Sequence, residues 1–398
     1  MLGLCLSAVF VSLGASEAFA RRDAHGFIAT LAGDDRRVFE AYLAAKTFHD
    51  ADLDAFWAKV DSKRKQRRAK KKKGSVITAR DYVDGYPPEY DGPSLPSALA
   101  KAWSKYLLDD TKPKTRKTAK ELPGISDYLR QAKAQYGFVP DRIPEREFKK
   151  RYAREALRLG LNSDQVVRVY ALETSGLGTA DMQAGIHPIK RTGKPISSAL
   201  GYAQLLAANS INELQKHGVS FLKRLRERAD DPNIDSSRRA ALETKIAALS
   251  KMVKRVKQVP QRWSSHQSFA RTDAGMGVHP INIDGDIGPW LQVIKLKGIR
   301  DTAVRAGRPG IGPTELELMN LAGPGAGLEM MTSAGLMVST VNFFSRGGYE
   351  RNTIVRGTTA RGLLERLSQR MDENVKNSGA QEFYEVFAEA QKELRAQN

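Results

Sequence analysis

The chain has 398 residues, of which 41% are hydrophobic and 27% are charged. This length and apolar content allow a sizeable core, exclude a fully disordered chain, and favour either two domains or one domain with long appendages. Its 64 Lys and Arg residues outnumber its 45 Asp and Glu residues and give a formal net charge of +19, so we expect an anionic partner.

The first 20 residues predict a secretory signal peptide. An apolar run over residues 2–13 precedes small residues, and the sequence AFA at 18–20 fits cleavage by signal peptidase. The run is shorter than the ~18 residues of a transmembrane helix, and a short buried helix is the alternative interpretation. Cys5, the single cysteine, would leave with the signal, so the mature chain could enter an oxidising compartment without a thiol.

Residues 21–120 are predicted to form a helical and basic extension of low order. Residues 21–60 have a helical pattern, and turns rich in proline and glycine follow at 86–96. Between them, residues 63–73 (KRKQRRAKKKK) carry nine cations and no acid, which is typical of a solvated tether. No aromatic residue interleaves with these cations, so a specific nucleic-acid site is not expected. Anionic envelope polymers or an acidic lipid surface are the expected partners of this segment.

After about residue 120 the sequence predicts a mainly α domain with few strands. Apolar residues recur at helical spacing between Pro144 and Gly160, and Asn162 with Gln165 forms a capping-box pattern at the start of the next helix. The helices predicted further along include an exposed charged hairpin, a helix containing Trp290 and a short helix from Thr314. The hairpin covers 208–228 and 236–257, and two amphipathic helices near 358–373 and 379–396 end the chain.

One carboxylate in this domain is predicted to point inward. Val166, Val169, Tyr170 and Glu173 lie at i, i+3, i+4 and i+7, so they share one face of a helix. Burial would raise the pKa of the Glu173 carboxyl and keep it protonated near neutral pH, as a general acid requires. The helix is predicted to end at once, at 174–178, where the helix dipole also disfavours ionisation. A hydrogen bond to neighbouring backbone is an equally good interpretation of this pattern alone.

Four short blocks follow one another in this region. They are 171–176 (ALETSG), 199–206 (ALGYAQLL), 282–291 (NIDGDIGPWL) and 319–325 (MNLAGPG). In content and order they resemble the glutamate signature, the Gly-Gln block, the Asn-Ile element and the Asn-Ala-Gly-Pro-Gly turn of the soluble lytic transglycosylase family. The resemblance covers about residues 145–330.

The resemblance implies a lysozyme-like α fold with a glycan cleft and with Glu173 at its centre. It also implies cleavage of peptidoglycan in the periplasm by one glutamate, which protonates the leaving oxygen and then deprotonates the 6-hydroxyl of the sugar to give a 1,6-anhydro product. Gly201 and Gln204 would line sugar subsites. Tyr202 is expected either to stack on a sugar or to pack in the core, and Asn320 either to bind sugar or to hold the turn after it.

The sequence departs from the family pattern at several positions. Thr174 follows the glutamate where the family has serine, Tyr202 and Ala203 replace Leu-Met, and Met319 replaces a tyrosine. The hairpin region at 208–260 is interpreted as an insertion. We expect the domain to span 121–345, followed by C-terminal helices at 346–398 that pack on it.

Two other functions stay open at this point. Asp181, the nearest acid in the loop after Glu173, could be the second carboxylate of a true muramidase. The same fold could also serve as a non-catalytic peptidoglycan-binding scaffold. No metal or other cofactor is expected, because the six histidines lack ligand spacing and the pair Asp284 and Asp286 lacks the rest of a calcium loop.

Overall fold

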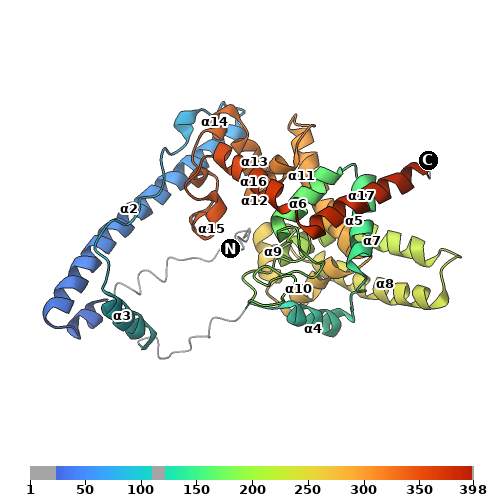
Figure 1. Cartoon of the computed structure of the whole chain (residues 1–398), viewed down its shortest axis with the longest axis horizontal. Coiled ribbons are helices and arrows are strands. Elements are labelled where there is room, and N and C mark those ends of the chain that lie inside the picture. The colour runs from blue at the N-terminus through green and yellow to red at the C-terminus, as the bar shows by residue number, and fades with distance from the viewer. Residues whose placement is uncertain (1–23, 110–121, 397–398) are drawn as a thin grey trace. The chain divides into compact units, whose positions relative to one another are not determined.

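The computed structural model describes residues 24–109 and 122–396, which are mainly helical and contain no strand (Figure 1). The predicted mainly α class is therefore confirmed. The predicted signal peptide at 1–20, including Cys5, lies outside the described residues. Within the described residues, no helix is both long and apolar enough to cross a membrane.

The described residues form two compact units. One contains residues 122–329 and 364–396, and the other contains 24–109 and 330–363. This division differs from the expected boundary at 345, because the segment 330–363 packs with the N-terminal residues. The last helix belongs to the unit that contains 122–329. In chain order, the helices α13 (Pro324–Met330) and α16 (Ala360–Asn374) lead from one unit to the other.

The unit with residues 24–109 is built on the 40-residue helix α2 (Gly33–Lys72). The remaining elements of this unit are η1 (Ala79–Asp81), α3 (Ser97–Asp109), α14 (Ser333–Leu336), η3 (Thr340–Asn342), α15 (Arg346–Arg351) and η4 (Thr353–Val355). An aromatic cluster joins the start of α2 to α3, with ring centroids 4.8 Å apart for Phe27 and Phe39 and 5.1 Å apart for Phe39 and Trp103.

The basic segment at 63–73 is not the solvated tether that was predicted, because α2 continues through it. Arg67 is 2% exposed, and its guanidinium donates hydrogen bonds to the carbonyls of Asp81 at 3.1 Å and Asn342 at 2.7 Å. It also lies over the ring of Tyr82, 4.4 Å from the centroid. The side chain of Asn342 in turn bonds the backbone of Val83. These contacts join segments about 260 residues apart and explain why 330–363 belongs to this unit.

The other unit holds most of the helices. Its elements are α4 (Ile125–Tyr136), α5 (Glu145–Arg158), α6 (Ser163–Thr174), α7 (Ala207–Ala229), α8 (Ser236–Val256), α9 (Trp263–Phe269), α10 (Asp273–Val278), η2 (His279–Ile283), α11 (Ile287–Arg305), α12 (Pro313–Ala322) and α17 (Ser378–Ala396). The hairpin α7–α8 was predicted as two exposed helices. Both helices form as predicted, but their inner faces are buried in one apolar cluster with α10 and α11, through side chains such as Leu214, Leu225 and Leu249.

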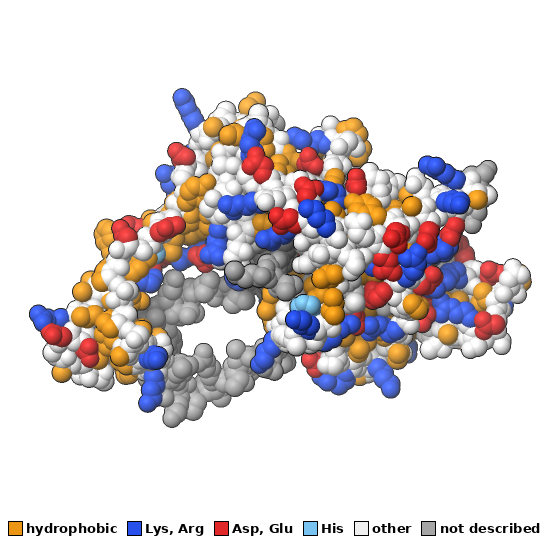
Figure 2. Space-filling view, viewed as in Figure 1, with side chains coloured by type: hydrophobic (Ala, Val, Ile, Leu, Met, Phe, Trp, Pro, Cys, Tyr) orange, Lys and Arg blue, Asp and Glu red, His pale blue; other side chains and the backbone are white. Residues whose placement is uncertain are grey.

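The last helix, α17, covers α5 and α6. Phe383 packs against Tyr152 and Tyr170, with ring centroids 5.6 and 5.3 Å away. Outside this contact, cations of α5 pair with acids of α17, for example Lys150 with Glu393 at 2.5 Å. Figure 2 shows red and blue side chains side by side over this part of the unit. The contact between α17 and α6 fixes the helix that carries Glu173.

Candidate active site

Helix α6 brings Glu173 to the edge of the core. Asn162 caps the helix, and its side chain and that of Gln165 form the predicted capping box. Val166 and Tyr170 are each 1% exposed, whereas Glu173, one turn further on, is only partly buried. The helix ends at Thr174 because Ser175 adopts a left-handed conformation with φ 55°. The predicted helix, its cap and its end are therefore confirmed.

Glu173 meets three polar side chains from two other helices. The amide nitrogen of Asn320 donates a hydrogen bond to Oε1 of Glu173 at 3.1 Å and lies 3.2 and 3.4 Å from the two carboxylate oxygens of Glu317. Both residues are on α12. From α11, the ammonium of Lys295 donates to the amide oxygen of Asn320 at 2.6 Å. We call Glu173, Lys295, Glu317 and Asn320 the carboxyl cluster.

Burial sets the protonation of this cluster. It raises the pKa of Glu317 to about 7, although the hydrogen bond from Asn320 and the charge of Lys295 oppose the shift. The pKa of Glu173 is raised well above its ordinary value by burial first and by the neighbouring Glu317 charge second. Burial also lowers the pKa of Lys295, against the attraction of both glutamates. Near neutral pH the two carboxyl groups therefore hold a proton that isolated glutamates would release.

The structure gives Asn320 a role that differs from both expectations. We expected it to bind sugar or to hold the turn at 323–325, but its amide instead bridges Glu173, Glu317 and Lys295. Glu317 was missed by the sequence analysis. A signal was present, since Glu317 and Asn320 lie at i and i+3 and must share one face of α12.

The Gly-Gln block closes a tight turn rather than presenting free polar groups. Gly201 has φ 81°, and a Cβ added there would lie 2.7 Å from the amide nitrogen of Gln292 on α11. The backbone at Gly201 therefore approaches the side chain of Gln292 closely, and both this contact and the positive φ favour glycine. The amide of Gln204 is buried and donates to the carbonyls of Gly201 at 2.8 Å and Met182 at 3.2 Å, so its donor is used within the turn.

Tyr202 lies in the core and is 1% exposed. Its ring contacts four aromatic side chains, and its hydroxyl donates to Glu145 at 2.6 Å. The ring centroids lie between 4.9 and 5.8 Å away, in the residues Phe148, Tyr152, Tyr170 and Phe383. Of the two interpretations of this residue, core packing is the one that matches the structure, because the neighbouring rings cover the faces that a sugar would need.

Asp181 is tied to cations instead of facing Glu173. Its carboxylate pairs with Arg142 at 2.6 Å and Arg191 at 2.9 Å and accepts a hydrogen bond from Thr179 at 2.6 Å. Burial would raise the pKa of Asp181, but these partners outweigh it and hold the pKa below its ordinary value. The carboxyl group that lies beside Glu173 is that of Glu317.

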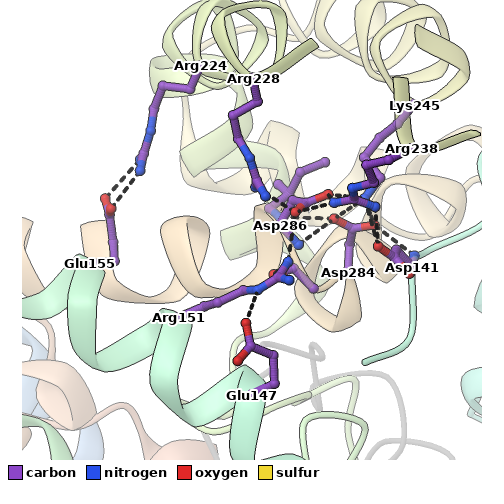
Figure 3. Close-up of polar contacts among 12 residues, drawn as sticks. Asp141, Glu147, Arg151, Glu155, Arg224, Arg228, Arg238, Lys245, Asp284 and Asp286 are labelled. Carbon is purple, nitrogen blue, oxygen red and sulfur yellow. Dashed lines mark hydrogen bonds and ion pairs between the residues drawn. The ribbon is translucent and has the colours of Figure 1, made fainter. Parts of the chain in front are cut away.

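Asp284 and Asp286 form a buried ion-pair network (Figure 3). Lys245 of α8 donates to Asp284 at 3.0 Å and to Asp286 at 2.5 Å, while Arg228 of α7 reaches Asp286 at 2.6 Å. Arg151 and Arg238 complete the contacts of Asp286 at 2.9 and 2.8 Å. The network attaches the hairpin α7–α8 to the start of α11. In the part of the chain that the structure describes, no group of His, Cys, Asp and Glu could hold a metal ion.

A shallow surface pocket lies elsewhere in the same unit, where α8 ends and α9 begins. Its volume is about 420 Å³, and its lining includes Arg255, Gln258, Ser264 and Phe269. No residue of the carboxyl cluster lines it. Its lining offers no acid for general acid catalysis, so the candidate active site is placed at Glu173 on its chemistry rather than at this pocket.

Comparisons of the chain with protein-family models, with curated proteins and with solved structures found no match. Two features of the chain itself bear on its function. They are the carboxyl cluster around Glu173 and the four sequence blocks, two of which contribute Glu173 and Asn320 to that cluster.

Proposed function

We propose that this chain is a lytic transglycosylase that cleaves the β-1,4 bond between N-acetylmuramic acid and N-acetylglucosamine in peptidoglycan, with Glu173 as its acid and base. The observation that carries the proposal is the placement of Glu173. It stands at the end of α6, partly exposed, next to a buried second carboxyl group that favours its protonated form. A protonated carboxyl that substrate can reach is what protonation of a glycosidic oxygen requires.

The proposed reaction needs one acid that becomes a base. Glu173 gives its proton to the glycosidic oxygen as the bond to the muramic C1 breaks and positive charge develops on the sugar ring. The 6-hydroxyl of the same sugar then attacks C1, and the Glu173 carboxylate takes the proton of that hydroxyl. The product is a 1,6-anhydro sugar, and Glu173 returns to its protonated form. Because the nucleophile belongs to the substrate, a second carboxylate across the bond is unnecessary.

The arrangement of acids supports this reaction over hydrolysis by two carboxylates. Two-carboxylate glycosidases place their acids on opposite sides of the sugar, about 5–9.5 Å apart. Glu317 instead shares an amide donor with Glu173 and is 0% exposed, so no sugar fits between the two. Asp181 already has Arg142 and Arg191 as partners. A true muramidase is therefore the less supported alternative.

We further propose that the protein acts after export to the periplasm and that helix α2 helps it to stay on anionic envelope polymers. Lys65, Arg68 and Lys72 are exposed and lie at i, i+3 and i+7, so they form one cationic stripe on the outer face of α2. The stripe contains no apolar side chain, which favours attraction to an anionic polymer over insertion into a lipid surface.

Purified sacculi test the catalytic proposal against the scaffold alternative. The wild type, Glu173→Gln and the control Glu315→Gln would be incubated with sacculi, and both soluble glycan and protein in the pellet would be measured. Release by the wild type and Glu315→Gln, with binding but no release by Glu173→Gln, supports an enzyme. Binding by all three without release supports a peptidoglycan-binding scaffold.

A further inference from the structure

The position of Glu317 is unexplained by the single-acid reaction. Its carboxylate is fully buried, and its two oxygens lie 3.2 and 3.4 Å from the Asn320 amide nitrogen that also bonds Glu173. A buried carboxylate is costly unless it is paired, so a residue placed here without a role would be expected to be neutral or apolar. The contact itself is one that like charges avoid, because two ionised carboxylates this close repel each other.

We propose that Glu317 is a positioning residue that holds the catalytic proton on Glu173 between turnovers. This inference rests on the proposed function of Glu173. At and above neutral pH, the resting state has one proton on Glu173, directed at the Glu317 carboxylate, while Asn320 bonds both groups. At lower pH Glu317 carries a proton as well. Glu317 does not touch substrate, because its side chain is fully buried, whereas Glu173 is only partly buried.

A count of charges supports this assignment. With one proton between them, the two carboxyl groups carry one negative charge, which the Lys295 ammonium balances. Without the Glu317 charge, burial alone would oppose the attraction of Lys295, so the pKa of Glu173 would fall and a larger share of Glu173 would be ionised. An ionised Glu173 cannot protonate a glycosidic oxygen. The cluster therefore keeps Glu173 protonated despite the neighbouring Lys295 cation.

The same contact assists the second half of the reaction. Once Glu173 has given its proton to the leaving oxygen, two neighbouring carboxylates remain and their repulsion increases the affinity of Glu173 for a proton. The 6-hydroxyl of the sugar supplies that proton as its oxygen bonds to C1. The proton count of the cluster is then the same as before the turnover, and no other reactant is needed.

A purely structural role for Glu317 makes a different prediction. If Glu317 only fills space and accepts a hydrogen bond from Asn320, a glutamine could do the same, because its side-chain oxygen also accepts. Activity would then change by a similar factor at every pH. If Glu317 holds the proton, Glu317→Gln lowers the pKa of Glu173, and activity is lost mainly at the alkaline end of the profile.

The test is the pH profile of kcat/KM from pH 4 to 9 for the wild type, Glu317→Gln and Glu315→Gln. The control changes a glutamate on the same helix that lies outside the carboxyl cluster. We expect the alkaline limb of the Glu317→Gln profile to move at least one unit towards lower pH. At pH values above the limb, this shift corresponds to about a tenfold loss of kcat/KM relative to the wild type. The control should follow the wild type. An unmoved limb, or an equal loss at all pH values, overturns the inference.

A second variant keeps the test informative if Glu317→Gln does not fold. Lys295→Met removes the cation that favours ionisation and should move the alkaline limb in the opposite direction, towards higher pH. If the alkaline limb of Lys295→Met moves towards lower pH instead, the assigned balance of charge between Lys295 and the two glutamates is wrong. A wild type that releases no product at any pH contradicts the proposed function instead, and the unfolding experiment described below then tests Glu317 without any need for activity.

Discussion

The buried carboxyl of Glu317 should make the stability of its unit depend on pH in a direction that can be worked out. Its pKa is about 7 in the folded chain against an ordinary value of 4.5. Between these two values the folded chain keeps a proton that the unfolded chain releases. The contribution of Glu317 to folding is therefore most favourable below pH 4.5 and is lost as the pH rises through 7.

The size of this effect follows from the same two values. A rise in pKa from 4.5 to about 7 corresponds to about 3 kcal/mol, at ~1.4 kcal/mol per pH unit. Glu173 adds to the effect in the same direction, because its pKa is also raised. Glu317→Gln removes the contribution of Glu317 to the pH dependence of the free energy of unfolding. It also reduces the contribution of Glu173, because the neighbouring charge that raises the pKa of Glu173 is lost. Relative to Glu317→Gln, the wild type should therefore lose about 3 kcal/mol of stability between pH 4.5 and pH 8.

Urea unfolding between pH 4.5 and pH 8 measures this difference. The signal would come from the fluorescence of Trp263 and Trp290, in chains where Trp57 and Trp103 of the other unit are replaced by Phe. The comparison between wild type and variant cancels the titration of groups that both chains share. If the two free energies of unfolding stay parallel across this range, Glu317 does not carry a buried proton and the reasoning about the carboxyl cluster is wrong.

Three other variants test the surrounding structure. Asp286→Asn removes one of the two buried carboxylates that pair with Lys245, leaves Asp284 as the other, and should cost up to about 3 kcal/mol in the free energy of unfolding, measured by urea titration. Gly201→Ala places a Cβ at a positive φ and 2.7 Å from the Gln292 side-chain amide, and should cost about 1–2 kcal/mol; a neutral result in thermal unfolding would contradict this account of Gly201. The third variant replaces the cationic stripe by Gln at Lys65, Arg68 and Lys72. It should pellet less with anionic polymer than the wild type does at low salt, and equally well at high salt. Weaker binding of the variant to acidic vesicles would indicate a lipid surface instead.

Local sequence patterns predicted much of the helical structure. The cap at Asn162, the end of α6 after Glu173 and the helices of the α7–α8 hairpin were all predicted close to where they are found. Each of these features depends on contacts within a few residues of the chain. The packing of 330–363 with α2 could not be predicted in this way, because it depends on Asn342 meeting a helix more than 270 residues earlier.

Only those features of the site that depend on contacts within one helix could be predicted from the sequence. The inward direction of Glu173 follows from the spacing of apolar residues on its own helix. The partnership with Glu317 depends on the packing of α12 against α6, which one helical pattern does not encode. Tyr202 had two possible roles in the sequence, and only the aromatic residues gathered around it from α5, α6 and α17 decide between them.

The products released from purified sacculi test the central claim most directly. Mass spectrometry of the soluble fragments from the wild type should find muramic ends in the 1,6-anhydro form, each lighter by one water than a hydrolysed end, and Glu173→Gln should release none. Fragments with free reducing ends would contradict the account, because they would require a water nucleophile and a second carboxylate on the opposite side of the sugar, which neither Glu317 nor Asp181 provides.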